Sequence, residues 1–95
     1  MESDILTIEV DGIPMSVDRN AFDDFRLLGL AAQYQDGDLT ILYKLAVAFL
    51  GEEQLENVLR SIEEARGHAS ISYMSGFINR LMEQTAQAVR GEAKN

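Results

Sequence analysis

The sequence contains no cysteine and no tryptophan, one proline and one histidine, and half as many basic as acidic residues. Without cysteine there can be no disulfides, thiolate nucleophiles or thiolate metal sites. Sixteen acidic and eight basic residues give a formal net charge of −8, which would repel a phosphate backbone. We therefore expect no thiol chemistry and no nucleic-acid partner.

The sequence also has no apolar run long enough for a membrane. In the longest run, LTILYKLAVAFL at residues 39–50, Lys44 is the only charge. Twelve helical residues rise about 18 Å, whereas the hydrocarbon core of a bilayer is roughly 30 Å thick. We expect this run to be buried in protein. The first residues, MESDILTIEV, also lack the basic start and apolar core of a signal peptide, which favours a cytoplasmic protein.

Residues that could support catalysis or hold a metal are few and poorly spaced. His68 is the only imidazole, and we interpret it as an exposed loop residue rather than a base or ligand. The acid pairs at 23–24, 52–53 and 63–64 are predicted on helices, where adjacent side chains diverge by about 100°. Solvated helix surface is the simpler interpretation of these pairs. We therefore expect no enzyme activity, no metal and no cofactor.

A β-hairpin is the clearest local signal that the sequence does contain. Asp11-Gly12 is typical of a type I′ turn, and pairing around it places six apolar residues on one face: Leu6, Ile8, Val10, Ile13, Met15 and Val17. The other face is polar or carries Pro14, as in a solvated hairpin with an exposed edge. An isolated hairpin is marginally stable, so helices are expected to cover the apolar face of residues 5–17.

Helical spacing of apolar residues follows the hairpin and predicts four helices, over residues 19–34, 38–50, 52–65 and 70–90. The predicted N-caps are Asp18, Asp38 and Ser70. Residues 91–95 are expected to form a frayed polar tail. The predicted fold is a single α+β domain of residues 1–90, mainly α, with an N-terminal hairpin followed by four helices packed as a small bundle.

The predicted helix 38–50 carries more apolar surface than a helix packed on one side needs. Thr40 and Lys44 are its only polar side chains, and apolar residues cover the other roughly 260° of its circumference. A central core helix explains this pattern. The alternative is a contact surface for another chain, formed beside Lys44 by Ile41, Val47 and Ala48.

The predicted helix 70–90 offers a second candidate surface. Tyr73, Met74 and Phe77 lie on or beside its apolar stripe, and methionine and tyrosine adapt to varied partners. A methionine-containing stripe at helical spacing is, however, more often part of a core. Both interpretations stay open for these three residues.

The predicted hairpin and helices are contained in four sequence phrases: ILTIEVDGIPMSVD, AFDDFRLLGLAAQYQDGD, LTILYKLAVAFLGEEQLENV and SISYMSGFINRLME. These phrases and their order resemble those of the tail assembly chaperones of long-tailed bacteriophages and prophages. The resemblance covers residues 5–83 and rests on element order rather than on a catalytic signature. The family has no catalytic residues to carry over, so the resemblance implies a role and not a site.

That implied role is the binding of a partner protein during phage assembly. Chaperones of this family coat the helical segments of the tape measure protein in the host cytoplasm and keep them soluble. Tail tube subunits later replace them, which makes the tail tube protein a second implied contact, and the chaperones are not retained in the virion. A self-assembling structural subunit of a phage or prophage particle stays open as an alternative. In that case the surplus apolar face closes a homo-oligomer.

Overall fold

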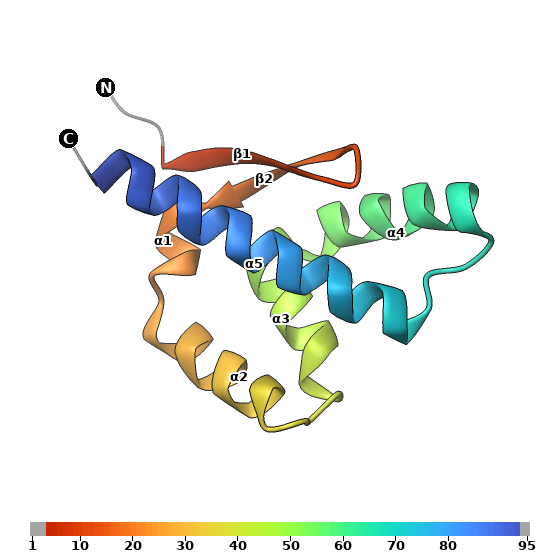
Figure 1. Ribbon diagram of the computed structural model, residues 1–95, viewed down its shortest axis with the longest axis horizontal. Helices are drawn as coiled ribbons and strands as arrows, with labels where there is room; N and C mark the ends of the chain where they lie inside the picture. Colours follow the sequence, from red (N-terminus) through yellow and green to blue (C-terminus); the bar gives the residue numbers. More distant parts are fainter. Residues whose placement is uncertain (1–3, 94–95) are drawn as a thin grey trace.

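The computed structural model describes residues 4–93 and shows, over this range, an N-terminal hairpin followed by five helices (Figure 1). The strands are β1 (Ile5–Val10) and β2 (Ile13–Asp18). The helices are α1 (Arg19–Phe22), α2 (Phe25–Gln35), α3 (Ile41–Leu50), α4 (Glu52–Arg66) and α5 (Ile71–Ala93). The predicted fold class, an α+β chain that is mainly α, is confirmed.

The hairpin has the predicted register. Val10 pairs with Ile13 and Leu6 with Val17. The turn residues Asp11 and Gly12 have φ values of 53° and 81°, as a type I′ turn requires. All six apolar residues of the inner face are buried except Ile13, which is half-buried. Helices cover this face, because α5 packs against β1 and α3 against β2 (Figure 1).

A side chain of α4 closes the outer edge of β2. The Gln54 amide accepts a hydrogen bond from the Ser16 N–H at 2.7 Å and donates one to the Ser16 carbonyl at 2.8 Å. It also donates to the Leu50 carbonyl at 3.0 Å. The amide therefore makes the pair of bonds that a third strand would make. Pro14 lies two residues before Ser16, so its backbone nitrogen also points away from β1. The N–H that proline lacks therefore removes no hydrogen bond between β1 and β2.

The single helix predicted over residues 19–34 is wrong, because the chain divides it into α1 and α2. The break falls at Asp23 and Asp24, which were expected on a helix. Asp24 has extended backbone, and its carboxylate accepts the Arg26 N–H at 2.8 Å, so it is the N-cap of α2. Asp18 caps α1 in the same way, as predicted. Aspartate favours caps over helix interiors, so a new helix starts here.

Two other helix ends differ from the prediction by more than one residue. α3 begins at Ile41 rather than at residue 38, because Asp38 instead holds a tight turn in which its carboxylate accepts the Thr40 N–H at 3.1 Å. α5 continues to Ala93, so a frayed tail is wrong for residues 91–93. Gly91 keeps helical backbone there, and glutamate and alanine favour a helix. Residues 94–95 lie outside the described residues.

α3 is the central helix of the core. Six of its ten residues are buried: Ile41, Leu42, Leu45, Ala46, Phe49 and Leu50. It contacts β2, α1, α2, α4 and α5. α2, in contrast, lies at the edge of the molecule away from the hairpin (Figure 1). The apolar run of residues 39–50 is therefore used mainly inside the protein.

Candidate protein-binding site

The four candidate contact residues of α3 do not form one surface. Lys44 and Ala48 are exposed, Val47 is half-buried, and Ile41 is buried. Ile41 was expected beside the outward line of the helix, but its side chain belongs to the core cluster and is not available to a partner. Thr40 is exposed with Lys44, so the polar line of α3 faces outward as predicted.

The three candidate residues of α5 are also separated by the fold. Phe77 is fully buried and Met74 is buried, so of the two interpretations left open by the sequence the core one holds for both side chains. Phe77 was proposed as a contact residue, and its complete burial excludes it from the surface. Tyr73 is half-buried, and its ring centroid lies 6.1 Å from that of Phe77.

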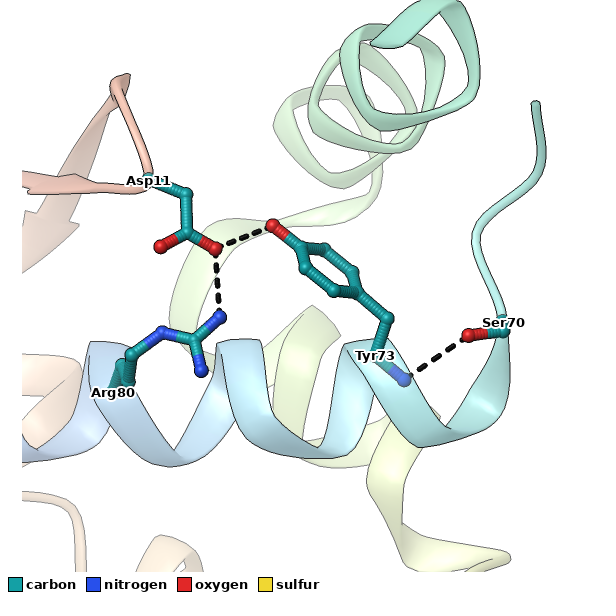
Figure 2. Close-up of polar contacts among 4 residues, drawn as sticks. All are labelled: Asp11, Ser70, Tyr73 and Arg80. Carbon is teal, nitrogen blue, oxygen red and sulfur yellow. Dashed lines mark hydrogen bonds and ion pairs between the residues drawn. The ribbon is translucent and has the colours of Figure 1, made fainter. Parts of the chain in front are cut away.

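Tyr73 joins α5 to the turn of the hairpin (Figure 2). Its hydroxyl donates to the Asp11 carboxylate, and the Arg80 guanidinium binds the same carboxylate oxygen at 2.7 Å. The Arg66 guanidinium lies over the Tyr73 ring, 4.1 Å from the centroid. Ser70, the predicted N-cap, accepts the Tyr73 N–H at 3.1 Å and fixes the start of α5. The cluster therefore fastens two segments that lie far apart in the sequence.

The charges of this cluster stabilise one protonation state. The hydrogen bond from Tyr73, together with Arg80, holds the pKa of Asp11 below its ordinary 3.8, and the bond to Asp11 and burial raise the pKa of Tyr73 above its ordinary 10.0. Ionised Asp11 and neutral Tyr73 are thus favoured together. Their contribution to stability is complete between these ordinary values, and is lost as pH falls below 3.8 or rises above 10.0. Neither group is poised to transfer a proton near pH 7.

An apolar groove opens where α3, α4 and the start of α5 meet. Leu39, Tyr43 and Ile71 stand at its rim, with 55%, 57% and 67% of their surface exposed. The groove has a volume of about 390 Å³, and its other lining residues are Thr40, Leu42, Ala46, Leu55, Leu59, Ala69, Met74 and Ile78. We call it the α3/α5 groove. Of the predicted contact residues it contains only Met74, at its floor.

A second groove lies between α2 and α5. Phe25 and Leu28 are its most exposed apolar residues, at 86% and 64%. The groove has a volume of about 700 Å³, and its other lining residues are Asp23, Asp24, Leu27, Ala31, Gln35, Phe49, Asn79, Met82, Glu83 and Ala86. We call it the α2/α5 groove. Phe25 and Leu28 fall within the single helix predicted over residues 19–34, whose apolar residues were expected to pack in the bundle, so sequence reasoning missed this surface.

The described residues contain little that points to other kinds of site. Within residues 4–93, no group of three or more histidine, aspartate and glutamate side chains is arranged to hold a metal ion. No helix in this part of the chain is both long and apolar enough to cross a membrane. His68 is exposed in the loop after α4, as interpreted from the sequence. Comparison of the chain with protein-family models, curated proteins and solved structures found no match.

Proposed function

We propose that the protein is a non-catalytic tail assembly chaperone that binds helical segments of the tape measure protein of a long-tailed phage or prophage. The observation that carries this proposal is the α3/α5 groove, an apolar surface left open on a strongly acidic chain. The resemblance of residues 5–83 to this family supplies the identity of the partner. Its place of action is then the cytoplasm of the bacterial host.

The groove fits the way in which an amphipathic helix is bound. Such a helix lays its apolar residues, spaced at i, i+3, i+4 and i+7, into a groove between other helices. The rim of the α3/α5 groove offers Leu39, Tyr43 and Ile71 for this contact. The net charge of −8 keeps the complex soluble while the partner is bound.

The expected affinity of a single groove is low. Complete burial of a large apolar side chain contributes about 1.5–3 kcal/mol, so three rim residues that are about half exposed contribute about 3–5 kcal/mol together. Association costs at least about 4 kcal/mol in lost translational and rotational freedom. One copy therefore holds a helix weakly, and many copies along one long partner hold it together. Weak individual contacts suit a chaperone that another protein later replaces.

Co-expression with the long helical protein encoded nearby in the same genome tests the proposal. We expect that protein to become soluble and to co-purify with the full chain. The double variant Tyr43→Ala, Ile71→Ala should lose this effect, because it removes two rim residues without touching the core. Ile5→Ala, which truncates an exposed apolar residue on β1, is the matched control and should behave as the wild type.

Two results would contradict the chaperone role. In the first, the long helical protein stays insoluble and no complex forms with the wild-type chain. In the second, light scattering finds a closed homo-oligomer whose size does not change when the partner is added. The second result would establish the alternative, a self-assembling structural subunit.

A further inference from the structure

The α2/α5 groove combines exposed apolar side chains with charge of one sign. Phe25 and Leu28 line it from α2, and Met82 and Ala86 line it from α5. Phe49 of α3 also lines it. An isolated exposed apolar residue is ordinary, but here two large ones lie on the same helix and open into the same groove.

The polar residues of this groove are acidic or neutral. Asp23, Asp24 and Glu83 line it, and the remaining polar lining residues are one glutamine and one asparagine. Arg26, the only basic residue of α2, is not among the lining residues. A bound segment therefore meets an apolar floor and three carboxylates, and no basic lining residue neutralises them.

We propose that the α2/α5 groove is a second docking site, and that its occupant is an amphipathic helix whose apolar stripe is flanked by lysine or arginine. Apolar residues of the occupant contact Phe25 and Leu28, and its basic residues pair with the carboxylates of Asp23, Asp24 and Glu83. A second copy of this chain fits poorly, because it would bring one acidic surface against another. An anionic lipid surface is disfavoured for the same reason.

This site is distinct from the α3/α5 groove, so the inference goes beyond the proposed function. The Tyr34 hydroxyl of α2 is hydrogen-bonded to the Ser75 hydroxyl of α5. The two grooves share no lining residue, so each can be altered without the other.

Two designed peptides serve as probes. Each is about twenty residues long, above the roughly 12–15 residues below which an isolated helix is marginal in water, with leucines at i, i+3, i+4 and i+7. In one peptide all the remaining positions are lysine, and in the other they are glutamate. Binding to the full-length chain is measured by fluorescence anisotropy, and the contact surface is mapped by amide chemical shifts in NMR spectra. We expect the lysine peptide to bind at α2 and the facing side of α5, and to bind more weakly as salt is added. The glutamate peptide should not bind.

Three variants locate the binding energy. The double variant Phe25→Ser, Leu28→Ser should lower the affinity for the lysine peptide about tenfold or more, because it removes a central apolar contact. The triple variant Asp23→Asn, Asp24→Asn, Glu83→Gln should also lower the affinity for the lysine peptide, and it should reduce the salt dependence of that affinity. Asparagine caps helices as well as aspartate does, so α2 keeps its start. Tyr43→Ala with Ile71→Ala, in the other groove, should leave binding unchanged.

Three results would overturn the inference. The glutamate peptide could bind as tightly as the lysine peptide, which would remove the charge argument. Binding of the lysine peptide could be lost only in the Tyr43→Ala, Ile71→Ala variant, which would place all helix binding in the α3/α5 groove. Light scattering could show that the Phe25→Ser, Leu28→Ser variant dissociates an oligomer, which would make a second copy the occupant. Urea unfolding of each variant confirms that it is folded.

Discussion

Replacing Gln54 by alanine removes the side chain that closes the outer edge of β2. Three hydrogen bonds are lost, two to the backbone of Ser16 and one to the Leu50 carbonyl. A hydrogen bond contributes about 0.5–1.5 kcal/mol net to stability. Ser16 is exposed, so water replaces the lost partners and each bond counts near the lower limit. We therefore expect Gln54→Ala to lower the free energy of unfolding by about 1–2 kcal/mol.

Urea unfolding followed by circular dichroism measures this loss. The midpoint should fall while the slope m stays constant, because the core is untouched and the surface exposed on unfolding is the same. In a domain of this size, each kcal/mol lowers the thermal midpoint by about 4–8 °C. Gln54→Glu should lose at least as much stability as Gln54→Ala. It keeps the side-chain length, but places a carboxylate oxygen against the carbonyls of Ser16 and Leu50.

The control for this experiment is Gln84→Ala on the exposed face of α5, which should change stability by less than about 0.5 kcal/mol. If Gln54→Ala changes stability as little as the control does, the amide does not pair with β2 in solution. Wild-type stability of Gln54→Glu would refute the reasoning in the same way, because a glutamate at this position has no donor for the Ser16 carbonyl.

Three further predictions concern other parts of the fold. Tyr73→Phe should cost about 0.5–1.5 kcal/mol at pH 7. In unfolding experiments at different pH, the difference from wild type should shrink below pH 3.8 and above pH 10.0, where Asp11 or Tyr73 changes its charge. A difference independent of pH would contradict the hydrogen bond between Tyr73 and Asp11. Asp24→Ala should cost about 1 kcal/mol by urea unfolding, and Asp24→Asn much less, because only asparagine can still cap α2; equal losses would argue against the cap. Phe77→Ala should cost about 3–5 kcal/mol, but Phe25→Ala less than about 0.5 kcal/mol, and thermal unfolding that ranks them otherwise would contradict the assigned burial.

The sequence predicted the hairpin well because two independent signals agree there. Asp11-Gly12 specifies the turn, and the alternation of apolar residues specifies which face is buried. The break between α1 and α2 was missed because apolar residues continue at helical spacing across Asp23 and Asp24. The spacing of apolar residues carries no information about which side chains bond to the backbone. The sign of an N-cap in this segment was the pair of adjacent aspartates, of which Asp24 accepts the Arg26 N–H.

The candidate site was harder to predict, because grooves are formed by several helices. The pattern of α3 identified a helix that is apolar almost all round, and the structure confirms its central position. It could not tell which part of that apolar surface the neighbouring helices leave uncovered. Tyr43 was counted among the apolar residues, but it is exposed, whereas Ile41 is buried. Ile71 is the first residue of α5, and it lies beside Leu39 and Tyr43 at the rim of the α3/α5 groove only because of the way α5 packs. The sequence pattern does not specify that packing.

The small number of buried side chains on α2 has a consequence for motion. Only Leu27 and Tyr34 are buried on this helix, against six residues on α3 and three on α4. Displacing α2 therefore exposes less apolar surface than displacing either of those helices, and its opening costs less free energy. The wall of the α2/α5 groove formed by α2 is thus held by fewer buried side chains than the wall formed by α5. If a helix docks in this groove as proposed, α2 is the wall that is displaced at the lower cost, which is the exposure of Leu27 and Tyr34.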